Sequence, residues 1–335
     1  MLFFLLFLFS LLLANPLLVA KSIQDGLYLF GFFILPSLFM YLVIIDLLIK
    51  YNISNLIGKK VKRIIGRIFK IQYDQSAFIV LSSFLVGNPT STKSIMDLID
   101  KKVISTDDGN SLIGFNHYFS IGFIITYIGG FLYNDMACSL IILISCWISN
   151  IIIGILGPKR PFLGVSILPP NKNESFYNEL LDSLNKALTI ILQIGCIILF
   201  FGVISGFFKL LPLNNEFQAI ICGLFEASNG MLLISNSNLS FILKICLSAA
   251  LLSFGGLSIH LQVYNLIKGK LLYFPFLIKR IIAMILSFFI SLFLIGFYKE
   301  SIFNYQINWN IILLIFMGFF IIVIIFINTL KTNAE

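Results

Sequence analysis

The residues that decide the fold are 82–94, "SSFLVGNPTSTKS", where an apolar run stops and a polar turn begins. Gly87, Asn88 and Pro89 interrupt the hydrophobic sequence, three hydroxyl residues follow, and Lys93 comes next. Irregular backbone is not tolerated against lipid, but it occurs in membrane proteins where protein or a water-filled cavity surrounds it. We therefore expect this turn to lie in the interior of a membrane protein.

The composition places the whole chain in a membrane. Of its 335 residues, 59% are hydrophobic and only 11% are charged, and the mean hydropathy is +1.01. A soluble core of this length does not need so much apolar surface, so the predicted fold class is an all-α polytopic membrane protein. The formal net charge is +8, but the basic residues lie between hydrophobic segments, so we expect no nucleic-acid partner.

A spanning helix needs about 20 apolar residues, and the chain contains about seven such windows. The first window lacks the basic start of a signal peptide, so we interpret it as a retained helix. Two further segments, 77–99 and 241–267, are divided near their middles by Gly87–Pro89 and by Gly255 with Gly256, and we interpret them as re-entrant or broken helices. The predicted spans are 1–19, 27–49, 111–131, 137–157, 184–208, 279–297 and 308–330.

An internal repeat is predicted from the positions of these breaks. A shift of 168 residues places Gly87 on Gly255 and also superimposes the spans that follow each break. If each copy contains an odd number of full spans, the two copies run in opposite directions, as in many secondary transporters with broken helices. Within one membrane domain, this predicts repeat one at about 27–157, a cytoplasmic linker at about 158–183 and repeat two at about 184–330.

Basic residues predict the topology and one lipid contact. Residues 50–70 are rich in lysine and arginine and should face the cytoplasm. Residues 53–71, "ISNLIGKKVKRIIGRIFKI", alternate basic and apolar residues at near-helical spacing, which favours an interfacial helix on the lipid bilayer over a solvated loop. The inverted arrangement places four basic residues on the outer side, against the usual bias: Lys268, Lys270, Lys279 and Arg280.

The helix expected after Pro89 should bind an anion. Its free N–H groups would point back toward the break and attract negative charge, and Lys93 would add a full positive charge. A lysine at membrane depth costs about 2.5 to 3.5 kcal/mol, so Lys93 should line water or have a partner. A plain ion pair with Asp97, one turn later, is the alternative. Asn88, Thr90, Ser91 and Thr92 complete this part of the predicted substrate site, with the hydroxyl residues as helix caps.

Further polar residues lie in other apolar segments. Glu226 and Asn229 are spaced to share one helical face, where Glu226 is either a coupling residue or a hydrogen-bonded structural acid. His260 is either a substrate or proton ligand or a neutral histidine satisfied by a neighbour on the helix. Asn116 and its neighbour His117 lie near the start of a span, facing either a cavity or the interface. These segments and the second break add the candidate substrate-binding residues Asn116, Glu226, Asn229, Ser258, His260 and Gln262.

The inventory does not indicate an enzyme. Only two histidines are present, and the sequence lacks the HExxH, GxSxG and phosphate-loop motifs. We expect no metal and no cofactor. A small anionic solute and the lipid bilayer are the expected partners, and the sequence leaves the oligomeric state open.

Four motifs carry a family resemblance. In order, "GNPTSTKSIMDLIDKKVIS" (87–105), "FNHYFSIGFII" (115–125), "GLFEASNG" (223–230) and "LLSFGGLSIHLQVYNLI" (251–267) resemble the YlbJ family of sporulation integral membrane proteins, part of the wider nucleoside-recognition (Gate) group. The likeness extends over about 16–297. In the family, the sequence at the first break usually reads Gly-x-Pro-x-Gly-Ala-Lys. This chain has Ser91 and Thr92 at the Gly-Ala positions.

The resemblance implies a function as well as a fold. It implies a multi-pass protein of the cell membrane, or of the forespore membrane in a sporulating organism, that takes part in spore maturation and moves dipicolinic acid, a small dicarboxylate. We therefore expect a transporter or permease for a small organic anion. The alternatives are a non-transporting membrane scaffold in spore maturation and a nucleoside-type solute transporter.

Overall fold

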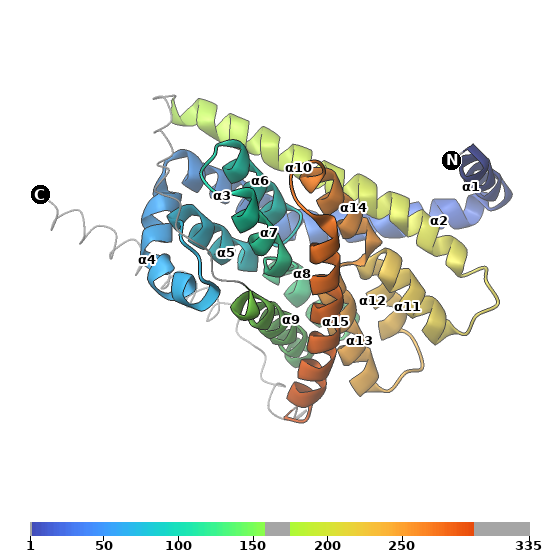
Figure 1. Cartoon of the computed structure of the whole chain (residues 1–335). Coiled ribbons are helices and arrows are strands. Elements are labelled where there is room, and N and C mark those ends of the chain that lie inside the picture. Colours follow the sequence, from blue (N-terminus) through green and yellow to red (C-terminus); the bar gives the residue numbers. More distant parts are fainter. Residues whose placement is uncertain (1, 158–174, 298–335) are drawn as a thin grey trace, which may run out of the picture. The chain divides into compact units, whose positions relative to one another are not determined.

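The computed structural model describes residues 2–157 and 175–297. The predicted span 308–330 lies outside the described residues, as does most of the predicted linker 158–183. The described part of the chain consists of helices joined by turns and short loops, with no strand (Figure 1). The predicted all-α class is therefore confirmed.

The helices follow one another along the chain as labelled in Figure 1. The first half contains α1 (Leu2–Ala14), α2 (Pro16–Leu29), the π-helical stretch η1 (Phe30–Ile34), α3 (Leu35–Lys50), α4 (Ile53–Phe69), α5 (Asp74–Val86), α6 (Thr90–Asp100), α7 (Thr106–Phe115), α8 (Ile121–Phe123), η2 (Ile124–Leu132) and α9 (Met136–Leu156). The second half contains α10 (Phe176–Phe208), α11 (Asn215–Phe225), α12 (Ala227–Ser235), α13 (Phe241–Phe254), α14 (Gly256–Ile267) and α15 (Tyr273–Ile295).

Five helical segments of the described part are long and apolar enough to cross a membrane. The predicted count of seven is not confirmed. The predicted span 1–19 is instead the 13-residue helix α1, which ends before Pro16 and is too short to cross by itself. The described end of the predicted linker is also helical, because α10 begins at Phe176. The five candidates are Pro16–Lys50, Met136–Leu156, Phe176–Phe208, Phe241–Ile267 and Tyr273–Ile295.

The described part of the chain contains four divided segments, whereas two were predicted from the sequence. The breaks at Gly87–Pro89 and at Gly255 lie where they were predicted. The predicted unbroken span 111–131 is also divided, because α7 ends at Phe115 and α8 begins only after Ser120. A fourth break separates α11 from α12 at Glu226. Both additional breaks lie inside apolar sequence without proline, which is why hydropathy alone did not reveal them.

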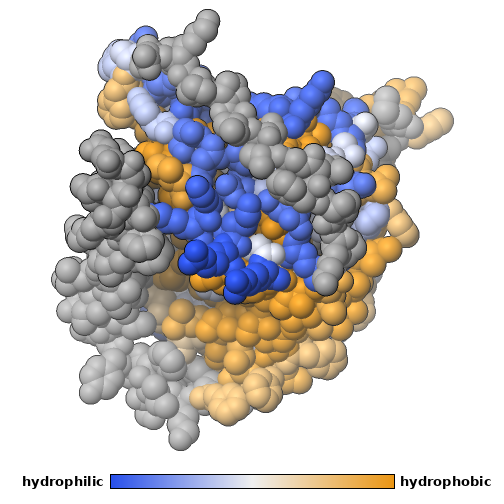
Figure 2. Space-filling model, turned by 60° about the vertical axis from the view of Figure 1, so that its left-hand side comes forward, coloured by the Kyte–Doolittle hydropathy of each residue, from blue (hydrophilic) through white to orange (hydrophobic). Residues whose placement is uncertain are grey.

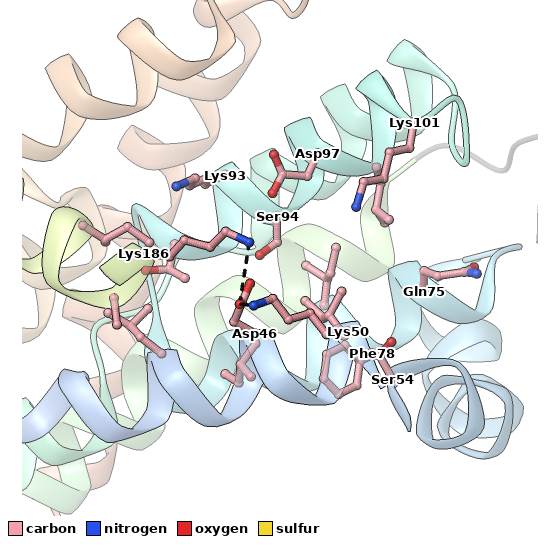
Figure 3. Close-up of a pocket in the computed structure, with 18 of the residues that line it drawn as sticks. Asp46, Lys50, Ser54, Gln75, Phe78, Lys93, Ser94, Asp97, Lys101 and Lys186 are labelled. Atoms are coloured by element: carbon pink, nitrogen blue, oxygen red, sulfur yellow. Dashed lines mark ion pairs between the residues drawn. The ribbon is translucent and has the colours of Figure 1, made fainter. Parts of the chain in front are cut away.

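Two of the divided segments are hairpins. Gln75 at the start of α5 and Lys101 just after α6 line the same pocket, so α6 turns back beside α5 (Figure 3). Helices α11 and α12 also turn back on each other, since a Cβ at Gly230 would overlap the backbone of Gly223. Ala219 and Ile234, near the outer ends of this second hairpin, share one hydrophobic cluster.

The other two divided segments run through the membrane domain in opposite directions. The hydroxyl of Tyr133, after η2, donates to the carbonyl of Lys244 at the start of α13 (3.3 Å). At the other end, the backbone N–H of Leu272, after α14, donates to the side chain of Asn110 in α7 (2.8 Å). The end of the segment α7–η2 therefore lies beside the beginning of α13–α14. At the opposite side, the beginning of α7–η2 lies beside the end of α13–α14.

This arrangement changes the predicted alignment of the two halves. The shift of 168 residues pairs the hairpin α5–α6 with the through-running segment α13–α14. The order of elements instead pairs hairpin with hairpin, α5–α6 with α11–α12, and then α7–η2 with α13–α14 and α9 with α15. The second hairpin opens at the side where α13 begins, because the Lys244 ammonium donates to the carbonyl of Ser235 at the end of α12 (2.8 Å). The two hairpins thus enter from opposite sides.

One side of the molecule is strongly polar. Figure 2 looks onto the side that carries α3, α4 and α6, where hydrophilic side chains gather above a hydrophobic band. Lys270, after α14, forms an ion pair with Asp100 at the end of α6, so these ends lie on the same side. Arg280 is fully buried in α15 and is not a loop charge. The expected conflict of Lys270 and Arg280 with the positive-inside bias therefore disappears.

Candidate functional site: a junction of four helix breaks and a polar pocket

The break at Gly87–Pro89 directly contacts the break between α7 and α8. Gly87 has φ +74°, and a Cβ there would overlap the carbonyl oxygen of Tyr118, so glycine is required on both grounds. The backbone N–H of Asn88 donates to the same Tyr118 carbonyl (2.9 Å). The chain reversal before α6 is thus held by the loop between α7 and α8.

Asn88 organises the start of α6. Its side-chain oxygen accepts hydrogen bonds from the backbone N–H of Thr92 (3.3 Å) and from the Thr92 hydroxyl (2.9 Å), and the Ser91 hydroxyl also donates to it. Thr90, Ser91 and Thr92 were predicted to cap this helix, but they lie within its first turn. The cap comes from Asn88, one residue before Pro89.

His117 connects two breaks. The side-chain amide nitrogen of Asn88 lies 2.5 Å from His117 Nδ1. An amide nitrogen can only donate, so Nδ1 accepts and Nε2 carries the proton. A Cβ at Gly255 would lie 2.6 Å from that Nε2. The buried His117 ring therefore lies between the first break and the break at Gly255, and the two breaks predicted from sequence meet in space.

Glu226 forms the remaining break. Its two carboxylate oxygens accept from the backbone N–H groups of Ser228 (3.1 Å) and Asn229 (2.8 Å), and the side chain is buried. The prediction that Glu226 and Asn229 share a helical face is wrong, because Glu226 has extended backbone and precedes α12 as its N-cap. A Cβ at Gly256 would lie 3.1 Å from the backbone nitrogen of Ala227, so the break at Glu226 contacts the break at Gly255–Gly256.

We call this meeting point the break junction. Beside it lies a hydrophobic cluster that includes Ile95 of α6, Ile113 of α7, Val263 of α14 and Phe276 of α15. The breaks thus lie inside packed protein, as irregular backbone at membrane depth requires. The break junction comprises Gly87–Pro89, residues 116–120, Glu226 and Gly255–Gly256.

His260 has a structural environment. Its Nε2 lies 3.1 Å from the carbonyl oxygen of Phe254 and its Nδ1 lies 2.9 Å from the hydroxyl of Tyr273. A carbonyl only accepts, so Nε2 donates and Nδ1 accepts from tyrosine. Both ring nitrogens are therefore occupied. Ser258 is buried and Gln262 is half-buried on the same helix, α14.

A pocket of about 1010 Å³ opens on the polar side between α3, α5, α6 and α10 (Figure 3). Of the residues predicted to bind substrate, Thr90 and Lys93 line it. Asn88, Ser91, Thr92 and Asn116 are bonded to one another and to neighbours at the break junction, next to the first turn of α6. The predicted site is thus divided among the pocket, the break junction and α14. Glu226 and Asn229 belong to the second hairpin, and Ser258, His260 and Gln262 belong to α14.

An ion-pair network forms one wall of the pocket. The Lys50 ammonium lies 3.3 Å from Asp46, 3.0 Å from Glu179 and 2.6 Å from Asp182, and only 8% of the Lys50 side chain is exposed. Lys186 lies 2.6 Å from Asp182 and 3.8 Å from Asp46, and so extends the network; Figure 3 shows the contact with Asp46. The network joins α3 to α10. The acids of α10 were not among the residues predicted from the sequence, because they lie more than 120 residues from Lys50 along the chain.

The opposite wall is formed by α6. Lys93 and Asp97 of α6, and Lys101 directly after it, line the pocket on this side (Figure 3). No ion pair joins Lys93 to Asp97 among the described residues, so the alternative of a plain intrahelical pair is not observed. Four lysines and four acids line the pocket in all, and their formal charges cancel. Three of the four carboxylates lie on the α3–α10 wall, whereas Lys93 lies near the N-terminus of α6.

Comparison with known proteins supports the family resemblance that the sequence motifs indicated. The chain is 20% identical to the sporulation integral membrane protein YlbJ of Bacillus subtilis (strain 168), over 83% of this chain and 78% of that protein. The chain is similar to a sporulation membrane protein. This match confirms the resemblance drawn from the motifs. No family model matches the chain, and no solved structure matches it. The relative and the candidate spans together identify a multi-pass integral membrane protein.

Proposed function

We propose that the chain is a membrane transporter that binds a small organic anion between the pocket and the break junction. The observation that carries the proposal is the position of α6. Its first turn, at Thr90 and Lys93, lines the pocket, and the same helix begins at a junction of four helix breaks. Broken helices that meet inside the membrane form the substrate sites of many secondary transporters.

The local electrostatics at α6 favour an anion. The start of a helix carries about half a positive charge, and Lys93 adds one full charge close by. The Thr90 hydroxyl supplies a further donor at the same end. A carboxylate of the solute would lie at this end, while the acids of the α3–α10 wall would repel a second carboxylate placed near them. Dipicolinic acid, which the family resemblance implies, has two carboxylates close together and suits the α6 end.

Uptake into liposomes tests the proposal. Purified protein should move dipicolinate in preference to nucleosides and simple dicarboxylates. Lys93→Gln should lower uptake by about tenfold or more, because a hydrogen bond to a charged group contributes about 1.5 to 3 kcal/mol. Lys101→Gln is the matched control, since Lys101 lines the same pocket but lies at the end of α6 away from the break junction. Equal loss in both variants, or uptake of none of the solutes, would contradict the proposal.

The helix α4 supports a proposed lipid contact. Leu56, Ile64 and Ile68 are 48%, 66% and 40% exposed and recur on one face, and the exposed basic residues are Lys59, Arg63 and Arg67. This combination suits an interfacial helix against anionic headgroups. In nanodiscs, anionic lipid should raise the thermal stability of the wild-type protein above its value in zwitterionic lipid. Replacing the three basic residues by glutamine should remove that difference.

The same variant separates transport from a scaffold role. A non-transporting scaffold that recruits other proteins through α4 should lose its role in spore maturation when these three charges are removed. It should be indifferent to Lys93→Gln. A transporter should show the opposite pattern, with normal uptake after the α4 changes and reduced uptake after Lys93→Gln.

A further inference from the structure

Arg280 of α15 is buried completely, at 0% exposure, in the interior of a membrane protein. Its Nη2 donates to the carbonyl of Gly114 (2.5 Å) and its Nη1 donates to the carbonyl of Ser253 (3.3 Å). The guanidinium carbon lies 5.7 Å from the ring centroid of Phe276. In residues 2–157 and 175–297, no carboxylate forms an ion pair with Arg280.

The two carbonyls that bind Arg280 occupy equivalent places. Gly114 is the residue before the last in α7, and Ser253 is the residue before the last in α13. Both helices are the first half of a through-running divided segment, and they correspond in the alignment of the two halves. Arg280 therefore donates hydrogen bonds to equivalent carbonyl groups at the C-terminal ends of two corresponding half-helices.

The charge of Arg280 is balanced by these helix ends. The C-terminus of a helix carries about half a negative charge on its unpaired carbonyl groups, so two such ends offset about one guanidinium charge. Arginine suits the position because its planar group presents several N–H donors in fixed directions and stays protonated, whereas a lysine ammonium is a single point charge.

In transporters with broken helices, half-helix C-terminal ends and unwound carbonyls coordinate the mobile coupling cation. We propose that the guanidinium group of Arg280, which is covalently part of the protein, occupies the position of such a coupling cation between the C-terminal ends of α7 and α13. Solute movement then needs no mobile metal cation at these two helix ends. The statement about solute movement rests on the proposed transport function, while the cation-holding role of Arg280 does not.

Thermal unfolding of the full chain in detergent tests the cation-holding role without any solute. The wild-type protein, Arg280→Lys and Arg280→Ala are compared in chloride salts of sodium, potassium, choline and methylguanidinium at equal ionic strength. The wild-type melting temperature should be the same in all four salts. Arg280→Ala should melt roughly 5 to 10 °C lower, because two helix ends lose their buried partner.

Rescue distinguishes a missing cation from a simple loss of packing. Millimolar methylguanidinium or sodium should restore part of the stability of Arg280→Ala, and choline should not. Arg280→Lys should fall between the wild type and Arg280→Ala. Arg63→Ala on α4 is the control, since Arg63 is exposed and its loss should create no cation response.

Three results would overturn the proposal. The first is a wild-type protein that gains stability from sodium over choline, which would reveal a free cation site. The second is Arg280→Ala with wild-type stability, and the third is a destabilised Arg280→Ala that no cation rescues. If Arg280→Ala does not fold, the salt response of the wild type and of Arg280→Lys decides.

Uptake measurements test the consequence for coupling. If the wild-type protein transports the anion, uptake should be equal in sodium and choline buffers, and a several-fold stimulation by sodium would contradict the coupling statement. If no uptake occurs in either buffer, the proposed function fails, but the unfolding experiment still decides the role of Arg280.

Discussion

The side-chain nitrogen of Asn88 lies 2.5 Å from Nδ1 of His117, and this contact joins the hairpin α5–α6 to the break between α7 and α8. The same His117 ring faces Gly255 from its other nitrogen. One buried histidine thus connects three segments that are far apart in the sequence.

Replacing Asn88 by alanine should destabilise the protein. The change removes the cap of α6, which contributes about 1 kcal/mol, and leaves His117 without its buried partner, at a further cost of about 1 to 3 kcal/mol. Thermal unfolding in detergent measures the loss. Asn265→Ala, an exposed position on α14, is the control and should change little. Equal stability of the two variants would show that the Asn88 contacts are unimportant.

Glycine at 255 should be required by packing and not only by backbone conformation. Gly255 has φ +96° and Gly269 has φ +81°, so alanine is strained at both positions by about 1 kcal/mol or more. Only Gly255 is crowded, since nothing lies within 4 Å of a Cβ at Gly269. Gly255→Ala should therefore lower the unfolding temperature clearly more than Gly269→Ala. Similar shifts would refute the close approach of His117.

Lys50 should stabilise the contact between α3 and α10. Replacing it by glutamine leaves the nearly buried Glu179 beside the partly exposed Asp46 and Asp182 without the Lys50 ammonium, which should cost about 1 to 3 kcal/mol. Lys21→Gln is the matched control, because Lys21 forms an exposed pair with Asp25 that contributes only about 0.3 to 0.5 kcal/mol. Chemical or thermal unfolding of both variants gives the comparison. A small loss at Lys50 would mean that the network is solvated and weak.

Glu226 should act as a helix cap. Glu226→Ala removes both acceptors at the start of α12, whereas Glu226→Gln keeps one of them, so the loss of stability should be larger for alanine. If Glu226 instead served to couple transport to a cation or proton, Glu226→Gln would abolish uptake while leaving the unfolding temperature unchanged. Measuring stability and uptake on the same preparations separates these roles.

The sequence by itself determined the membrane class and several of the spans. Long apolar runs such as 137–157 must form helices that satisfy their own backbone groups in lipid, and α9 follows this rule. The breaks at Gly87–Pro89 and at Gly255 were also predictable, because glycine and proline act on the local backbone. The four family motifs were also recognisable from the sequence, because each is a short run of adjacent residues.

Only the tertiary structure decided how these elements meet. The break after Phe115 is held by contacts with Asn88 and Arg280, which lie far away in the sequence, and its local mark is limited to Ser120, which caps α8. Whether a divided segment turns back or runs through is likewise fixed by contacts such as that of Tyr133 with Lys244. The sequence counted Arg280 among the basic residues of the outer side, yet it is buried, and two distant helix ends supply the negative potential that offsets its charge. Interactions between distant residues are set by packing, which hydropathy and local propensity do not encode.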